Sequence, residues 1–294
     1  MTDSWLETQA RAKINLRLKI FPRRPDGFHP LQTIFCRLDL ADRVRVRLRS
    51  EPGVSMRVSG SESAPEGPDN LAARAAAALI EHAGVGLGAE VELVKVIPAG
   101  SGLGGGSSDA AAVLRLLSQV IEPAPEPDAL MQLAARLGSD VPFFAADVPI
   151  ALASGRGEEL VASSGAGIAA RPMLLLIPDR RISTAEAYGW WDEEHGEAVV
   201  GVESLTLSES TLSDWDGLAA LAKNDFEAVI YARNPALAAM RQALGATQPD
   251  IALLSGSGSS LFAVYDSEKR RDRAARRLGA ECDAVQLISA RGPV

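Results

Sequence analysis

Cysteine is scarce in this chain. Its 294 residues include two cysteines, Cys36 and Cys282, too few for a disulfide framework or for a metal site built from cysteines. Histidine is almost as rare, and His29, His82 and His195 lie far apart in the sequence. The sequence therefore predicts no histidine–cysteine metal site, and it favours a reducing compartment.

Long apolar runs are also missing. No stretch approaches the ~18 consecutive apolar residues of a membrane-spanning helix. The first residues, MTDSWLETQ, are acidic and polar, unlike a signal peptide or an Arg-rich transit peptide. We therefore expect a cytoplasmic protein with no membrane partner.

Positively charged residues are outnumbered: the chain has 30 lysines and arginines and 38 acidic residues, so that its formal net charge is −8. This balance argues against nucleic acids and acidic membranes as general partners. The basic stretch at residues 269–278 predicts a solvated helix face rather than a binding patch. Hydrophobic residues make up 47% of the chain, enough for a real core, and the length suggests two domains of about 100–200 residues each.

Glycine, in contrast, is concentrated at one place. The stretch IPAGSGLGGGSSDAAAVLRLL, residues 97–117, holds five glycines between Gly100 and Gly106. The pattern before it predicts a strand at 91–97, and the spacing after it predicts a helix. A helix leaves its first four N–H groups unpaired and carries partial positive charge there, so bare glycine backbone lets a phosphate approach them. A flexible linker seldom lies directly between a strand and a helix, so we favour a phosphate site.

This glycine loop differs from the two commonest phosphate-binding patterns. A Walker A loop ends in Gly-Lys-Ser/Thr, and no lysine follows these glycines. The dinucleotide pattern G-x-G-x-x-G is met by Gly100, Gly102 and Gly105, but the acidic residue expected ~20 positions later is missing, because Glu122 lies in a proline-rich loop. The longer string P-x-G-x-G-L-G-G-G-S-S resembles the ATP-binding loop of the GHMP kinases, the family of galactokinase, homoserine kinase and mevalonate kinase.

The resemblance extends along the chain. AKINLRL near the N-terminus and LSGSGSSLF at residues 254–262 resemble the first and third motifs of that family, the third being a glycine turn that packs beside the phosphate loop. PDGFHPLQT, LGSDVPFF and ISTAEAY resemble one branch, whose substrate is an alcohol carrying a cytidine diphosphate group. The matches run in order from Ala12 to Phe262, nearly the whole chain.

The resemblance implies an α+β fold, the two-domain GHMP kinase fold. Its N-terminal domain shares a fold with a ribosomal protein domain, and its C-terminal domain is an α/β sandwich. The segment ASSGAGIAARP is rich in small residues and has no periodic pattern, so we place the domain boundary there. The expected domains are residues 1–165, which bind ATP, and residues 166–294.

Local patterns predict the main elements. Residues 10–20 alternate strictly and predict a half-buried strand, and residues 44–48 and 54–58 are expected to form an antiparallel pair. Further elements are expected as a strand at 173–178, helices at 218–222 and 235–244, and a strand at 261–265. The expected N-caps are Asn70, Ser107 and Asp128, and the expected C-caps are Gly84 and Gly138.

Two residues carry the predicted chemistry. Lys13 lies on the polar face of its strand, where the residues alone indicate a solvated lysine, and Asp140 alone indicates a turn or cap. The resemblance instead implies that Lys13 stabilises charge near the γ-phosphate and that Asp140 is the catalytic carboxylate, which accepts the hydroxyl proton or orients the reacting groups. Asp109 is the competing acid, but an inward carboxylate would repel phosphate, so we expect it to be structural.

The resemblance implies ATP and Mg²⁺ as the phosphoryl donor and metal. Ser108 is the candidate for a contact to Mg²⁺ or to a phosphate oxygen, and Asn70 and Lys95 match positions that line the adenosine pocket. The expected ATP-binding residues are Pro98, Ala99, Gly100, Ser101, Gly102, Leu103, Gly104, Gly105, Gly106, Ser107, Ser108, Asn70 and Lys95. Ser101 stands where the family usually has Gly or Ala, which puts local hydrogen bonding in question.

The branch resemblance implies a cytosine site. The base would lie between Phe28 and Tyr188, with His29 reading its hydrogen-bonding edge. Phe28 stands where the branch commonly has Tyr, a change that keeps stacking and loses a hydroxyl. The expected substrate-binding residues are Asn15, Phe28, His29, Thr184 and Tyr188.

The sequence therefore predicts a kinase that phosphorylates a cytidine-diphosphate-bearing alcohol, acting as a monomer or homodimer. Another small-alcohol GHMP kinase, such as homoserine kinase, is the nearest alternative. An RNA-binding module is a different class, against which the glycine loop and the negative charge argue. An oxidoreductase with a dinucleotide fold is the remaining alternative and would be recognised by NAD(P)H binding.

Overall fold

The computed structural model describes residues 4–60, 64–163, 168–196, 212, 214–282 and 285–294. The chain forms two compact units that are interleaved in sequence. The first unit comprises Met1–Ala12, Leu40–Ala99 and Gly104–Asp147, and the second comprises Lys13–Asp39, Gly100–Leu103 and Val148–Val294. The expected boundary between residues 165 and 166 lies outside the described residues and stays a prediction.

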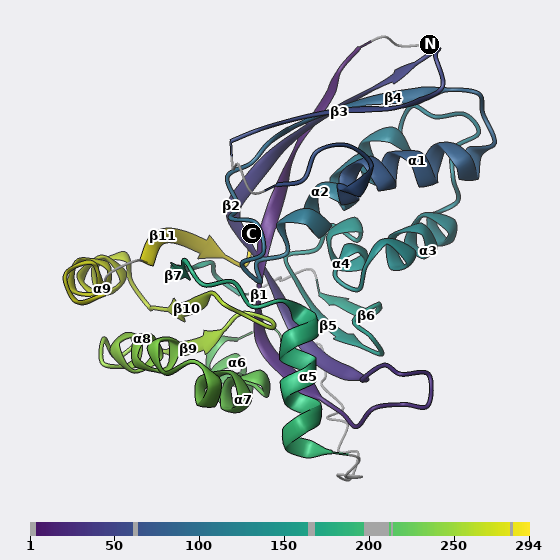
Figure 1. The fold of residues 1–294 in the computed structure, drawn as a ribbon. Coiled ribbons are helices and arrows are strands. Elements are labelled where there is room, and N and C mark those ends of the chain that lie inside the picture. The colour runs from purple at the N-terminus through teal and green to yellow at the C-terminus, as the bar shows by residue number, and fades with distance from the viewer. Residues whose placement is uncertain (1–3, 61–63, 164–167, 197–211, 213, 283–284) are drawn as a thin grey trace. The chain divides into compact units, whose positions relative to one another are not determined.

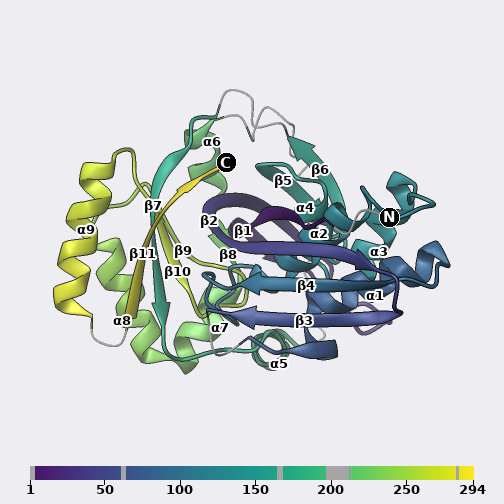
Figure 2. The same cartoon turned by 90° about the horizontal axis from the view of Figure 1, so that it is seen from above.

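In the sheet of the first unit, the strand expected at 91–97 lies between the two strands expected to pair with each other. Strand β4 (Gly88–Val94) lies between β2 (Leu31–Arg49) and β3 (Gly53–Ser59), antiparallel to β2 and parallel to β3 (Figure 2). The expected antiparallel pairing of 44–48 with 54–58 is therefore wrong. β1 (Leu6–Ile20) neighbours β2 and confirms the strand expected at 10–20, but its residues 12–18 are buried on both faces rather than on one.

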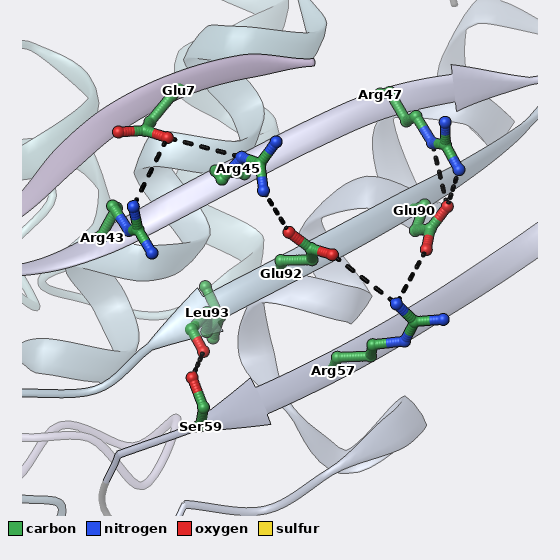
Figure 3. A network of polar contacts seen from close by, with 9 residues as sticks. All are labelled: Glu7, Arg43, Arg45, Arg47, Arg57, Ser59, Glu90, Glu92 and Leu93. Carbon is green, nitrogen blue, oxygen red and sulfur yellow. Dashed lines mark hydrogen bonds and ion pairs between the residues drawn. The ribbon is translucent and has the colours of Figure 1, made fainter. Parts of the chain in front are cut away.

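Charge explains why β4 is inserted (Figure 3). β2 presents arginines on the outer face of the sheet and β3 presents Arg57, so direct pairing would oppose like charges. Glu90 and Glu92 of β4 separate them: Arg47 contacts Glu90 at 2.6 Å, Arg45 contacts Glu92 at 2.7 Å, and Arg57 of β3 lies 3.8 Å from Glu92. The opposite face of β2 and β4 carries apolar residues, and its buried members include Val44, Val46, Val91 and Leu93.

The helices of the first unit are α1 (Leu71–Ala83), α2 (Gly105–Leu117), α3 (Pro127–Leu137) and α4 (Val141–Ala145), preceded by the 3₁₀ turn η1 (Gly67–Asp69) (Figure 1). Asn70 caps α1 as expected, because its side chain accepts from the Ala72 N–H, and Gly84 ends the helix with a left-handed φ of 66°. Gly138 is the C-cap of α3, but the expected N-cap Asp128 lies inside its first turn, since Pro127 starts the helix and Glu126 precedes it.

The second unit contains a four-stranded antiparallel sheet in the order β11-β7-β10-β9. Its strands are β7 (Arg171–Pro178), β9 (Ile251–Leu254), β10 (Leu261–Val264) and β11 (Val285–Gly292), and its helices are α5 (Thr184–His195), α6 (Trp215–Leu221), α7 (Phe226–Arg233), α8 (Pro235–Gly245) and α9 (Glu268–Glu281). The buried residues of α7, α8 and α9 form one core with this sheet, and they include Val229, Leu244, Leu278, Leu174 and Leu261. The expected strands at 173–178 and 261–265 and helices at 218–222 and 235–244 are confirmed.

Parts of the long strands belong to the second unit as well. Residues 33–36 of β2 pair with β5 (Ile150–Ser154), which in turn pairs with β6 (Glu159–Ser163), and Arg17 and Leu18 of β1 pair with the two-residue strand β8 (Lys223–Asn224). The fold is thus α+β, as expected. Among the described residues, no helix is both long and apolar enough to cross a membrane.

Candidate active site

The N-terminus of α2 is open. Gly104 is its N-cap with a φ of 74°, the helix begins at Gly105, and its first backbone bond runs from the Ser108 N–H to the Gly104 carbonyl at 2.9 Å. The N–H groups of residues 104–107 have no partner within the helix, and Gly104 at the N-cap position has no side chain that could accept from them. The expected N-cap Ser107 is wrong, because glycine can adopt the left-handed conformation and so starts the helix three residues earlier. This turn presents unpaired donors and a positive dipole end to an anion.

The loop packs closely at two glycines, and at Gly102 this packing requires glycine. In the first unit, a Cβ on Gly105 would lie 3.0 Å from Ile97 Cγ2 and 3.4 Å from Lys95 Nζ. In the second unit, Gly102 has a φ of +78°, and a Cβ there would lie 2.4 Å from the Ser255 carbonyl oxygen. These glycines therefore allow the loop to pack closely against its neighbours, in addition to leaving its backbone accessible to a ligand.

The segment LSGSGSSLF packs against the middle of the loop, as expected. Ser255 Oγ donates to the Gly102 carbonyl at 3.1 Å, and the Ser260 N–H donates to the Ser101 carbonyl at 3.3 Å. All four residues belong to the second unit. These bonds fix the course of residues 100–103.

A Gly102→Ala substitution tests this packing. We expect a loss of unfolding free energy of about 1–3 kcal/mol, because the new Cβ meets a backbone oxygen and the φ is unfavourable for alanine. Gly106 is the matched control, since a Cβ there meets no atom within 4 Å and the residue is helical. Gly106→Ala should leave stability unchanged or raise it by ~0.5–1 kcal/mol. Urea denaturation measures both, and equal stability of the two variants would contradict the packing argument.

Lys13 is buried rather than solvated, with 3% of its surface exposed. Its ammonium donates to Asn15 Oδ1 at 2.8 Å and to the Gly102 carbonyl at 3.1 Å. Asn15 Nδ2 in turn donates to Thr33 Oγ1 at 2.7 Å, and Thr33 Oγ1 donates to the Arg17 carbonyl at 2.6 Å. A buried cation is thus held directly on the glycine loop.

Asp140 precedes α4 in the first unit. It is partly buried, and its side chain makes no capping hydrogen bond to the helix, although it occupies the N-cap position. The interpretation of Asp140 as a capping residue therefore has no support. Asp140 belongs to the first unit and Lys13 to the second, and their joint action stays a prediction.

The side chains of Asn70 and Lys95 are engaged within the first unit. Asn70 caps α1 and its Nδ2 donates to the Pro65 carbonyl at 2.8 Å. Lys95 is held between Asp42 and Asp109, the latter at 2.5 Å. Their expected contacts to adenosine remain predictions.

Burial and neighbouring charge shift the pKa values of Asp109 and Lys95. Burial raises the pKa of Asp109 to about 7, although the charge of Lys95 opposes the shift. Burial also acts to lower the pKa of Lys95, but the charges of Asp109 and Asp42 outweigh it, so that pKa lies above its usual value. Asp42 was missed by the sequence analysis. A signal existed, because Asp42 shares the buried, even-numbered register of β2 with Leu38, Val44 and Val46.

The expected cytosine residues lie in the second unit. The His29 ring is buried and stacks on Tyr188, with 5.2 Å between ring centroids. His29 Nδ1 lies 2.9 Å from the Phe21 carbonyl oxygen, and Nε2 lies 2.8 Å from Asp192 Oδ1. The structure thus brings His29 and Tyr188 together and adds Asp192, which sequence reasoning missed.

Phe28 and Thr184 have other partners. Phe28 is 50% exposed, and the guanidinium of Arg156 lies 3.6 Å from its ring centroid. One face of Phe28 is therefore already stacked by a planar cation. Thr184 has a different partner: its Oγ1 and Ser257 Oγ are 3.1 Å apart, so the start of α5 contacts the glycine turn of residues 254–260.

Two family models match this chain. The model of the GHMP kinase N-terminal domain matches residues 70–155, and the model of the GHMP kinase C-terminal domain matches residues 206–284. The first match includes α1, the glycine loop and Asp140. A crystal structure of homoserine kinase from Cytophaga hutchinsonii has the same fold, with a TM-score of 0.67, 17% identity and coverage of 98% of this chain and 94% of that one.

More similar relatives narrow the family. The 4-diphosphocytidyl-2-C-methyl-D-erythritol kinase of Geobacter sp. (strain M21) is 36% identical over 281 residues, covering 96% of this chain and 95% of the relative. A crystal structure of 4-(cytidine 5'-diphospho)-2C-methyl-D-erythritol kinase has a TM-score of 0.77 and 33% identity, and covers 98% of this chain and 99% of that one. The chain therefore belongs to the GHMP kinases and, within them, to the family of 4-diphosphocytidyl-2-C-methyl-D-erythritol kinases.

Proposed function

We propose that this kinase transfers the γ-phosphoryl group of ATP to the 2-hydroxyl of 4-diphosphocytidyl-2-C-methyl-D-erythritol, in the non-mevalonate route to isoprenoids. The observation that carries the proposal is the likeness to kinases of that name over almost the full chain. The likeness to homoserine kinase reaches 17% identity and extends only to the fold. The segments PDGFHPLQT and ISTAEAY also favour the cytidyl substrate.

ATP with Mg²⁺ is the phosphoryl donor, and the open start of α2 suits its phosphates. The N–H groups of residues 104–107 would donate to phosphate oxygens, and the missing Cβ at Gly105 keeps the loop close to Ile97. Ser108, in the same turn, is the candidate protein ligand of Mg²⁺. Mg²⁺ bound to the phosphates neutralises part of their charge.

The chain's own residues would supply the remaining chemistry. The buried ammonium of Lys13 would stabilise negative charge that develops on the transferred phosphoryl group, and Asn15 orients that ammonium. Asp140 would accept the proton of the attacking hydroxyl. Phe28, Tyr188 and His29 would hold the cytosine, and Thr184 would contact the substrate from the start of α5.

ADP release over a panel of alcohols tests the proposal. We expect turnover with 4-diphosphocytidyl-2-C-methyl-D-erythritol and little with homoserine or mevalonate. Turnover of homoserine alone would replace the proposal by the nearest alternative. An absence of ADP production with every alcohol would favour a binding function instead.

Three expectations accompany this function. The domains would divide near residues 165 and 166, the protein would act as a monomer or homodimer, and it would work in the cytoplasm. The acidic net charge and the shortage of cysteine support the last of these. Light scattering of the purified protein determines the oligomeric state.

A further inference from the structure

Three charged side chains are buried together in the first unit. The exposed fractions are 4% for the Lys95 side chain, 0% for Asp42 and 2% for Asp109. They come from three elements: Lys95 follows β4, Asp42 lies in β2, and Asp109 lies at the start of α2. A buried ion cluster contributes little to the stability of a core, because replacing it by apolar side chains of similar volume is often neutral or stabilising. The presence of this cluster therefore points to a role in positioning the backbone of the segments that it connects.

Asp42 also binds the backbone at the start of the glycine loop. Its Oδ1 accepts from the Val96 N–H at 2.5 Å and from the Ile97 N–H at 2.8 Å. These two amides directly precede Pro98, the first residue of the loop string. The carboxylate thus fixes the point at which the chain leaves β4.

Lys95 connects this point to the other end of the loop. Its ammonium donates to Asp42 Oδ2 and, at 2.5 Å, to Asp109 Oδ2 in the first turns of α2. Gly105, the first helical residue, lies against both Ile97 and the Lys95 ammonium. The open N–H groups of residues 104–107 are therefore positioned by contacts that begin at Asp42.

We propose that Asp42 is a positioning residue for the phosphate loop: through Lys95 and the amides of Val96 and Ile97 it holds the N-terminus of α2 in the geometry that binds the phosphates of ATP. This inference rests on the proposed use of that N-terminus as the phosphate site. The side chain of Asp42 is fully buried, so in this proposal it acts on the loop and not directly on the nucleotide.

ATP affinity of three variants tests the proposal, measured by calorimetry well below each melting temperature. Asp42→Asn keeps one oxygen for the two amides but loses the charge that holds Lys95, and we expect its Kd for ATP to rise about tenfold. Asp42→Ala loses both functions and should bind more weakly still. Binding groups that are not held in place lower the affinity, because ordering them when the ligand binds costs conformational entropy.

Glu90→Gln is the matched control. Glu90 lies in β4, the strand that ends just before Lys95, and its side chain is 11% exposed. On the outer face of the sheet it forms an ion pair with Arg47 at 2.6 Å (Figure 3). This variant should lose stability but keep the wild-type Kd for ATP. A merely structural Asp42 would behave in the same way, with a lower melting temperature and unchanged affinity, and that result would overturn the proposal.

Hydrogen exchange of backbone amides in the wild type gives a second test, which does not depend on whether the variants fold. Val96 is 55% exposed, yet its N–H is bound by Asp42, so it should exchange slowly even without ATP. Fast exchange at Val96 and Ile97 would overturn the inference. If the wild type binds no ATP, the proposed function fails, whereas wild-type binding with unchanged affinity in Asp42→Asn would reject the inference alone.

Discussion

An Asp140→Asn variant should fold and bind ATP like the wild type, with kcat lower by about 10²–10⁴, the range for a lost general base. Asparagine has almost the same shape as aspartate but cannot take the hydroxyl proton. Folding should be spared, because the carboxylate makes no capping bond to α4 and the residue is only partly buried. Single-turnover ADP release and separate ATP titration distinguish chemistry from binding.

Asp128→Asn is the control for this experiment. Asp128 is an exposed acid in the first turn of α3 in the same unit, so its loss should change stability slightly and kcat not at all. If a folded Asp140→Asn protein turned over at near the wild-type rate, the carboxylate would be structural. A drop in ATP affinity with unchanged kcat would instead indicate that Asp140 serves nucleotide binding.

The wild type should prefer the cytidyl substrate to its uridyl analogue by about 10² or more in kcat/KM. Cytosine carries an amino donor where uracil has a carbonyl, and a site with buried partners for one edge leaves polar groups unpaired with the other. An aromatic face stacks on either base, at ~1–3 kcal/mol, and cannot distinguish them. Discrimination must therefore come from polar groups such as His29. Equal use of the two substrates would contradict the cytidine site.

The geometry of His29 indicates which atom is available for reading. The Phe21 carbonyl can only accept, so the bond at 2.9 Å requires a proton on Nδ1. Nε2 lies 2.8 Å from Asp192 Oδ1, so a base read at this nitrogen would meet His29 and Asp192 together. We expect His29→Ala to narrow the preference between the two substrates, whereas Phe28→Ala should weaken both alike.

Two comparisons check this assignment. His82→Ala changes an exposed histidine at the end of α1 and should leave the preference unchanged. Measurement of kcat/KM for both substrates on the wild type and the three variants separates the effects. A preference that survives in His29→Ala would assign the reading of the base to another group.

The sequence by itself determined the family, most of the elements and the position of the glycine loop between a strand and a helix. These depend on contiguous residues: the strict alternation at 10–20, the cap at Asn70, and the order of strand, glycines and helix at 91–117. Local periodicity and capping report such features because the physical cause lies within a few residues of the effect. The helix start was misplaced by three residues, since Ser107 is a good cap and only the backbone shows that Gly104 has a left-handed φ.

Only the tertiary structure decided which distant segments pair. β4 lies between two strands that are closer to each other in sequence, because Glu90 and Glu92 satisfy arginines on both sides. Lys13 occupies a polar position of an alternating strand, yet the Gly102 carbonyl and Asn15 bury its ammonium. Asp42 meets Lys95 across 53 residues of chain, and Lys95 in turn meets Asp109. Burial of a charge depends on partners brought from elsewhere in the chain, and no local pattern contains that information.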